Sequence, residues 1–309
     1  MIAPETILAL DHVAQQRELC DHLFLKSPHL RERALQLASE MLREQLESPI
    51  QFDPRSVEVE VDDQTLDRLF SVVSQQWTVC GENRPHHSVL SSDEYLPQNL
   101  NESAIQSMYQ SGADELALIK RLSERAGVDL SNKRRWLELG CGVGRVTVHL
   151  AKEFENVTAV DVSPGNLRHC IAMMTHLGIK NADLIQIRHV RDIENLGTFD
   201  GFFSRIVLQH NPPPVQRFIL DRILRSITHG GVACFQTVVG GKGYAYSAQL
   251  HLRGALSDDF EMHALPMRHI FEILSRLGFR VLDVFRELSG GYNVASYTFF
   301  AQRDTTQQR

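Results

Sequence analysis

The stretch from Trp136 to Arg145, with the sequence WLELGCGVGR, constrains the fold of this chain more than any other. A short apolar run that contains one acid predicts a buried strand, and three alternate glycines lead from it into an amphipathic segment over 146–154. Because glycine lacks a side chain, the backbone can turn tightly there and a ligand can lie directly against it. The pattern predicts a strand, a glycine turn and a helix that together hold a flat or elongated ligand.

The glycine spacing differs from that of a dinucleotide-binding loop. Gly140, Gly142 and Gly144 alternate, whereas the dinucleotide fingerprint has two residues, not one, between its second and third glycines. Glu138, just before the turn, suits a cationic ligand group better than a pyrophosphate. Taken alone, the glycines also fit an ordinary strand-to-helix turn.

Further strands follow in an order that favours a nucleotide-like ligand. A second short apolar strand ends at Asp161, and an acid at that position can accept both hydroxyls of a ribose lying across the first loop. Ser163 and Pro164 then predict the N-cap and first turn of a helix. A third strand is expected over 183–188 and a fourth over 199–210.

With these features in this order, the chain from about residue 109 to residue 303 resembles the class I S-adenosylmethionine-dependent methyltransferases. The resemblance implies an α/β fold, with a Rossmann-like, seven-stranded, mostly parallel sheet that ends in an antiparallel C-terminal hairpin, and S-adenosyl-L-methionine as the cofactor. The cofactor contacts that it implies are Glu138, Gly140, Cys141, Gly142 and Gly144 for the methionine part, Asp161 for the ribose, Asp192 and Ile193 for the adenine, and Ser204 and Arg205 beneath the sulfonium, with Val162 as a further cofactor contact.

The segment that enters this domain is expected as two helical pieces, 103–110 and 114–125, separated at Ser111-Gly112. By the resemblance, Tyr109 and Gly112 contact the carboxylate end of the cofactor; simple helix packing is the alternative. Arg145 either pairs with the methionine carboxylate or only begins a helix.

An accessory region precedes the methyltransferase domain. Residues 1–102 are expected to be mainly helical and residues 103–309 to form the domain. The expected parts of the accessory region are a helical hairpin over 4–46, a half-exposed strand over 57–61, a helix from Asp62 or Asp63 through Trp77, and a polar loop over 80–101. The region would either cover the substrate site or form a homodimer.

Histidines in two places invite a functional interpretation. His86 and His87 are adjacent, and on an extended segment their side chains point to opposite sides, so we expect no metal site there. They form either a solvated pair or a pair of which one member lines the substrate pocket.

His210 precedes three prolines that stop strand pairing and hold it at the rim of the site. It is predicted to act as the catalytic base, with a structural cap of the turn as the alternative.

An insertion over about 240–265, on the substrate side of the sheet, lengthens the connection after the fifth strand. Within it, Glu261 and His263 could flank the acceptor oxygen, which makes His263 the second predicted catalytic residue. The alternative is a lid that packs through Phe260 and Met262. Strands over 280–288 and 294–303 then form the closing hairpin.

The predicted reaction follows from the cofactor. Its sulfonium already makes the methyl group electrophilic, so the protein must mainly align the acceptor, exclude water and accept a proton. No metal is required. We therefore predict O-methylation of a small-molecule acceptor, a sugar or natural-product hydroxyl. The alternatives are an N-methyltransferase acting on a small-molecule amine and a cofactor-binding protein without catalysis.

Composition limits the partners and the compartment. The chain has 309 residues, 43% of them hydrophobic, and a net charge of −6, which is typical of a soluble globular protein of one or two domains. No basic stripe is visible, so nucleic acid is not expected as a partner, and without a long apolar run neither is a membrane. The five scattered cysteines favour the reducing cytoplasm.

Overall fold

A seven-stranded sheet forms the middle layer of the computed structural model, which describes residues 56–254, 260–287 and 294–305. The helical hairpin predicted over 4–46 lies outside these residues. The strand order is β3-β2-β1-β4-β5-β7-β6. The strands are β1 (Arg135–Leu139), β2 (Asn156–Asp161), β3 (Ala182–Gln186), β4 (Phe199–Ser204), β5 (Ile227–Gly241), β6 (Phe279–Glu287) and β7 (Val294–Arg303). Strands β1 to β5 pair in parallel, and β7 runs antiparallel to both β5 and β6, which confirms the predicted fold class.

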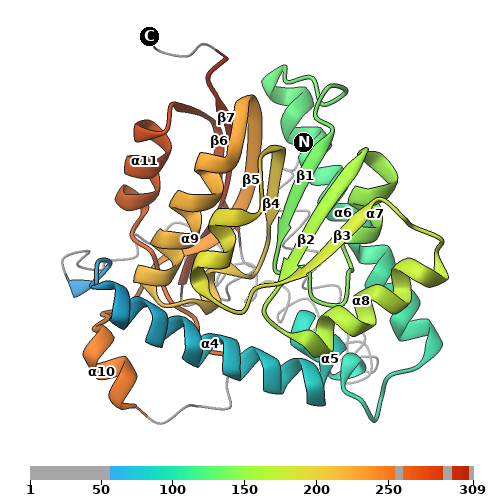
Figure 1. Cartoon of the computed structure of the whole chain (residues 1–309), viewed down its shortest axis with the longest axis horizontal. Helices are drawn as coiled ribbons and strands as arrows, with labels where there is room; N and C mark the ends of the chain where they lie inside the picture. The colour runs from blue at the N-terminus through green and yellow to red at the C-terminus, as the bar shows by residue number, and fades with distance from the viewer. Residues whose placement is uncertain (1–55, 255–259, 288–293, 306–309) are drawn as a thin grey trace, which may run out of the picture.

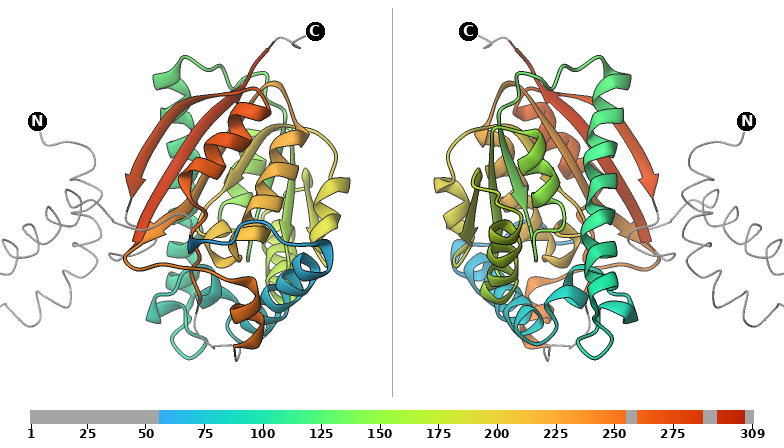
Figure 2. Two further views of the ribbon diagram at one scale, coloured as in Figure 1. Left: turned by 90° about the vertical axis from the view of Figure 1, so that its left-hand side faces the viewer. Right: turned by 90° about the vertical axis from the view of Figure 1, so that its right-hand side faces the viewer.

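Helices cover both faces of the sheet (Figures 1 and 2). One face carries η3 (Val190–Asn195), α9 (Pro213–Ser226) and α11 (Met267–Arg276), and the other carries α6 (Glu102–Ala126), α7 (Thr147–Glu153) and α8 (Pro164–His176). Alternate residues of β1 show the two layers directly, because Leu137 and Leu139 pack in one apolar core whereas Trp136 packs in the other. None of the described helices combines the length and the apolar character needed to cross a bilayer.

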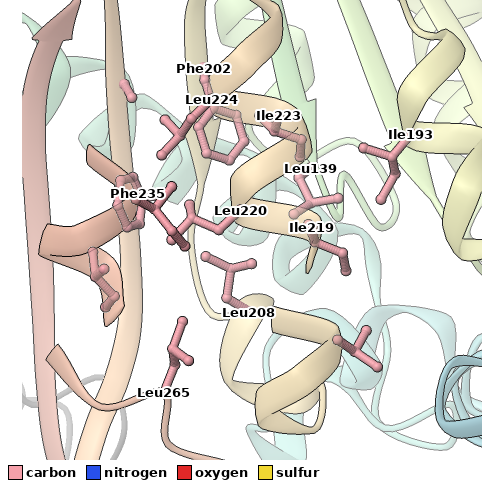
Figure 3. Close-up of a cluster of buried hydrophobic side chains, with 14 of the residues drawn as sticks. Leu139, Ile193, Phe202, Leu208, Ile219, Leu220, Ile223, Leu224, Phe235 and Leu265 are labelled. Carbon is pink, nitrogen blue, oxygen red and sulfur yellow. The ribbon is translucent and has the colours of Figure 1, made fainter. Parts of the chain in front are cut away.

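The core under α9 fixes the strands that bear the site. Figure 3 shows side chains of α9 converging on the sheet, where Ile219 and Leu220 lie close to Leu139 of β1. Phe202 of β4 and Phe235 of β5 belong to the same cluster and are fully buried. Burial of each such side chain is worth about 1.5–3 kcal/mol, so the carboxyl ends of these strands are held firmly together.

Helix α4 (Asp63–Asn83) lies across the edge of the sheet at which the parallel strands end (Figure 1). Asp62 caps it by accepting a hydrogen bond from the Thr65 N–H at 2.8 Å, as the sequence predicts. The strand predicted over 57–61 is wrong. Of that segment, Val57 alone forms a bridge, to Tyr246, because the segment meets the insertion at a single point instead of running along a strand.

Two predicted irregular or extended segments fold differently. The polar loop predicted over 80–101 is wrong, because α4 continues to Asn83 and is followed by α5 (Pro85–Val89) and η2 (Asp93–Tyr95). Tertiary contacts override the polar composition there, since Tyr95 is buried. The fourth strand ends at Ser204, not at residue 210. Ile206 has a left-handed backbone (φ 56°), which stops the strand, and Leu208–His210 form the short helix η4.

Helix α6 is continuous, so the predicted break at Ser111-Gly112 is wrong; Figure 2 shows α6 as one long helix along the sheet. Gly112 faces the chain that follows the glycine loop, and a Cβ placed on it would lie 2.0 Å from the carbonyl oxygen of Arg145. Gly112 is therefore present for close packing rather than to end a helix.

Replacing Gly112 with alanine tests this explanation. Alanine is the better helix former by about 1 kcal/mol, but here its methyl group would push α6 away from a backbone carbonyl. We expect Gly112→Ala to lower the free energy of unfolding by about 1–3 kcal/mol in urea denaturation. The exposed Gln110→Ala in the same helix should have little effect. A Gly112→Ala protein at least as stable as the wild type would contradict the close-packing account.

Candidate functional site

The loop between β1 and α7 is shaped by its three glycines. Gly140, Gly142 and Gly144 all have positive φ values, 73°, 55° and 88°, which residues with a side chain rarely adopt. The N–H groups of Gly140 and Cys141 donate to the carbonyl oxygen of Val160 at 2.8 and 3.0 Å. The loop is thereby fastened to the end of β2.

Asp161 strengthens the same attachment. One carboxylate oxygen accepts the Gly142 N–H and the other accepts the Ser163 N–H, both at 2.8 Å. Burial raises the pKa of Asp161, although these N–H groups act in the opposite direction. Each carboxylate oxygen has a second lone pair, and the residue lines a pocket, so it can still accept hydrogen bonds from a ligand.

Glu138, near the end of β1, is the second buried acid of the site. Its carboxylate accepts a hydrogen bond from the Thr147 hydroxyl at 2.6 Å. Burial raises its pKa to about 7 from the ordinary 4.5. A cationic ligand group beside it would favour the ionised form, in agreement with the sequence-based expectation.

These groups open into a pocket at the carboxyl edge of the sheet. Its empty volume is about 1020 Å³ when the solvent at its open mouth is included. Its walls come from α4, α5, the glycine loop, the end of β2, η3 and the turn after β4. The side chains from α4 are Phe70, Val73 and Trp77, and those from the turn after β4 include Arg205, Ile206, Val207 and His210.

The predicted cofactor contacts divide into two groups. Those that line the pocket are Glu138, Gly140, Cys141, Gly142, Asp161, Val162, Ile193 and Arg205, whereas Tyr109, Gly112, Gly144, Asp192 and Ser204 lie outside its lining. Residues of the second group support the pocket from behind. The Tyr109 hydroxyl donates to the Val143 carbonyl at 2.7 Å, and that of Ser204 donates to the Leu139 carbonyl at 3.2 Å. The Asp192 carboxylate accepts the N–H groups of Arg188 and His189, both at 2.8 Å.

Two arginines near the site share a carboxylate. Arg145 and Arg205 both pair with Glu115, at 3.0 and 3.1 Å, and Arg205 also pairs with Glu287 at 2.8 Å. These carboxylates raise the pKa of Arg205 against the opposing effect of burial. Arg145 lines the pocket, where it can still meet a ligand carboxylate.

His210 lies in the pocket wall, on η4. Its Nδ1 is 2.9 Å from the carbonyl oxygen of Glu261. Since a carbonyl only accepts, Nδ1 carries the proton and Nε2 keeps a lone pair. Burial lowers the pKa of His210 to about 4, so the ring is neutral near pH 7.

Two aromatic side chains pack around the His210 ring. Trp77 meets the ring edge-on, with 5.0 Å between the ring centroids, and Phe260 stacks on Trp77 at a centroid distance of 5.4 Å. The sequence places Trp77 on a helix, but its position in the pocket depends on where α4 packs.

His263 lies outside the pocket lining, behind His210. Its backbone N–H donates to the Gln209 carbonyl at 2.6 Å, and its ring Nε2 is 3.5 Å from the Glu261 carboxylate. Burial lowers its pKa to about 3. A third group, His251, completes this cluster, and no sequence pattern pointed to it.

His86 and His87 lie on α5, not on an extended segment. His86 is buried against His169, with ring centroids 5.1 Å apart, and burial lowers its pKa to about 4. His87 is 5.9 Å from the Phe260 ring. Neither lines the pocket; their neighbours Ser88 and Val89 do.

The buried Glu138 gives the fold a specific pH dependence. Its folded-state pKa is raised, so the folded protein holds a proton between about pH 4.5 and pH 7 that the unfolded chain releases. This contribution to stability is present below pH 4.5 and lost as the pH rises through 7. Relative to Glu138→Gln, the wild type should lose about 2 kcal/mol of unfolding free energy between about pH 5 and pH 8. The exposed Glu155→Gln is the control in the same urea titrations, and parallel profiles for wild type and Glu138→Gln would contradict the assignment.

Comparison with known proteins finds a methyltransferase domain in this chain. Residues 137–231 match a methyltransferase domain family. The ubiquinone biosynthesis O-methyltransferase of Colwellia psychrerythraea is 25% identical over 183 residues, 58% of this chain and 65% of that protein. The carboxy-S-adenosyl-L-methionine synthase of Dichelobacter nodosus is 26% identical over 124 residues, 38% of this chain and 49% of that protein. The chain thus spans less than two thirds of the length of either relative.

Solved structures agree in fold. The crystal structure of magnesium protoporphyrin IX methyltransferase from Synechocystis with bound S-adenosylhomocysteine superposes with a TM-score of 0.53 at 17% identity, covering 77% of this chain and all (100%) of that one. The same enzyme with bound S-adenosylmethionine gives 0.51 at 16% identity, covering 80% and 100%. The domain match, the strand order and the glycine loop fastened to an acid agree with one another. Residues 137–231 therefore form part of a methyltransferase domain, the surrounding sheet has the fold of the class I methyltransferases, and S-adenosylmethionine is the cofactor of this kind of domain.

Proposed function

We propose that this protein transfers the methyl group of S-adenosylmethionine to a hydroxyl group of a small molecule. The observation that carries the proposal is the position of His210. Its neutral ring, with Nε2 unprotonated, lines the same pocket as the glycine loop and Asp161. The pocket thus combines a place for the cofactor with a group that can accept the proton of a hydroxyl.

The proposed cofactor position uses the groups around the glycine loop. Asp161 accepts the ribose hydroxyls, and Glu138 faces the cationic methionine end. The adenine lies among apolar side chains of the pocket, Val162, Ile187 and Ile193. Two observations support this placement. The carboxylate oxygens of Asp161 have lone pairs that can accept further hydrogen bonds. Burial raises the pKa of Glu138, and a bound cation would lower this pKa again by stabilising the ionised carboxylate.

In the proposed mechanism the residues of this chain align the acceptor and take up a proton. The bound cofactor would supply an electrophilic methyl group, so that the acceptor oxygen would bond to the methyl carbon while the carbon–sulfur bond broke and left its electron pair on sulfur. The hydroxyl proton becomes strongly acidic as the new bond forms. Nε2 of His210, although a weak base, can therefore accept it. The Glu261 carbonyl keeps the ring in the required tautomer through Nδ1–H.

Apolar walls favour an apolar or aromatic acceptor over a bare sugar. Phe70, Val73 and Trp77 of α4 and Phe203 of β4 line the pocket. The Colwellia relative is named as an O-methyltransferase, which supports a hydroxyl as the acceptor group. Transfer to a small-molecule amine is the alternative, and a chain that binds the cofactor without transferring a methyl group is the second.

We also propose a division of labour along the chain. Residues 1–102 serve as the accessory region and 103–309 as the methyltransferase domain, with the region near 240–265 on the acceptor side. The support is that α4 lies across the carboxyl edge of the sheet and contributes side chains to the pocket lining. This position favours a role in covering the substrate site and not a role in forming a homodimer. We likewise propose a cytoplasmic location, and its support is that the four cysteines among the described residues form no disulfide with one another.

The cofactor proposal is tested by binding. Asp161→Ala removes the ribose acceptor and the attachment of the glycine loop, so S-adenosylmethionine affinity should fall at least about tenfold in calorimetry, in line with the loss of a charged hydrogen-bond partner. Asp200→Ala is the matched control, because Asp200 also accepts two backbone N–H groups, those of Arg134 and Arg135, but at the amino end of the sheet. Unchanged affinity in Asp161→Ala would contradict the cofactor placement.

The catalytic proposal is tested with methyl-labelled cofactor and a panel of phenols, sugar hydroxyls and amines. Transfer to a hydroxyl acceptor is expected, and His210→Gln should then lower kcat by about 10²–10⁴-fold while cofactor affinity stays near that of the wild type. His229→Gln, which alters an exposed ring, should leave kcat unchanged. Transfer to amines alone would support the N-methyltransferase alternative, and a His210→Gln enzyme with wild-type kcat would remove His210 from the mechanism.

A further inference from the structure

A cluster of three potential metal ligands lies behind the pocket wall. His251 belongs to α10 (Ala248–Arg253), and Glu261 and His263 lie on the segment that leads into α11. The candidate ligand atoms of the three side chains all lie within 4.8 Å of one another. Glu261 and His263 are two residues apart, so an extended backbone presents both on one side.

The distances within the cluster are those between ligands of one ion. Nδ1 of His251 and Nε2 of His263 are 3.7 and 3.5 Å from the same carboxylate oxygen of Glu261. These separations are long for hydrogen bonds. Zinc binds imidazole nitrogen and carboxylate oxygen at about 2.0–2.2 Å, which places neighbouring ligand atoms of a tetrahedral site about 3.3–3.5 Å apart. The three side chains need only small adjustments to share one cation.

The surroundings hold the rings in place. Nδ1 of His263 is 3.3 Å from the Tyr244 hydroxyl, so its Nε2 is left for an ion, and a hydrogen bond of this kind on the second ring nitrogen is usual for a metal-binding histidine. The Tyr246 ring lies 5.4 Å from the ring of His263 and 5.6 Å from that of His251. Its hydroxyl and Nε2 of His251 are buried and have no hydrogen-bond partner among the described residues.

We propose that His251, Glu261 and His263 bind a divalent transition-metal cation of the zinc type. Two imidazoles and one carboxylate suit such a cation better than Mg²⁺ or Ca²⁺, which prefer oxygen ligands. Three protein ligands leave at least one position of a tetrahedral site open.

The cation would fasten the insertion to the acceptor side of the pocket. It would join α10 to residues 261–263, and this short segment contacts the catalytic region directly. The Glu261 carbonyl accepts from Nδ1 of His210, and the His263 N–H donates to the Gln209 carbonyl. Phe260, the preceding residue, stacks on Trp77 of the pocket. Bound metal would therefore hold the wall of the acceptor site, and this role is independent of which acceptor is methylated.

The test measures metal binding directly and does not require activity. The full-length protein is freed of metal with a chelator and titrated with Zn²⁺ in calorimetry and with Co²⁺, whose visible absorption reports a tetrahedral site with nitrogen ligands. The wild type should bind one equivalent of Zn²⁺ at this site. His251→Gln and Glu261→Gln should each either lose that equivalent or bind it with an affinity that is lower by at least about 10–100-fold. A millimolar excess of Mg²⁺ should not displace the Zn²⁺.

His269→Gln is the matched control. His269 also pairs with a carboxylate, that of Glu272 at 2.9 Å, but belongs to no three-ligand group among the described residues. This variant should keep the wild-type stoichiometry and cobalt spectrum. Because the Glu261 side chain is 42% exposed, Glu261→Gln should fold normally, which circular dichroism verifies. Equal zinc stoichiometry and affinity in the wild type and both ligand variants, or no binding by the wild type, would overturn the proposal and leave the cluster as a histidine–carboxylate contact without an ion.

Discussion

The structure of the site depends on the hydrogen bonds that fasten the glycine loop to the end of β2. The Asp161 carboxylate accepts N–H groups from both sides, those of Gly142 and Ser163, and the Val160 carbonyl accepts two more from the loop. A loop with three left-handed glycines has high conformational entropy when free, so it forms one shape only because these bonds satisfy its backbone. The same carboxylate faces the pocket, so the group that holds the loop is also available to a ligand.

A second hydrogen-bonded network positions the opposite wall. The side chain of Gln236, on β5, accepts the Ile206 N–H at 2.7 Å and donates to Gln209 and Ser296, each also at 2.7 Å. All three side chains of this network are buried. The left-handed backbone at Ile206 costs on the order of 1 kcal/mol and persists because buried partners hold it. The turn in this shape carries His210 into the pocket wall.

Local patterns explain what could be predicted. The glycine loop, the strand that ends at Asp161 and the cap at Ser163 each arise from neighbouring residues, and all three form as expected. Prediction failed where the role of a residue depends on a contact with a residue far away in the sequence. Gly112 looks like a helix break but makes room for the carbonyl of Arg145, and the histidines of α5 look solvated although His86 is buried against His169. Such contacts leave no periodic signal along the chain.

Local sequence patterns account for the places of the first and second strands along the chain, the shape of the glycine loop and the acid at the end of β2, because side-chain period and glycine conformation act within a few residues. Which side chains meet around the pocket depends on long-range packing. Trp77 reaches His210 through the packing of α4 over the carboxyl edge of the sheet, and His251, on α10, which packs against α4, lies near Glu261 and His263. That packing results from burial of apolar surface, which is non-directional and sums over many residues, so no short stretch of sequence encodes it.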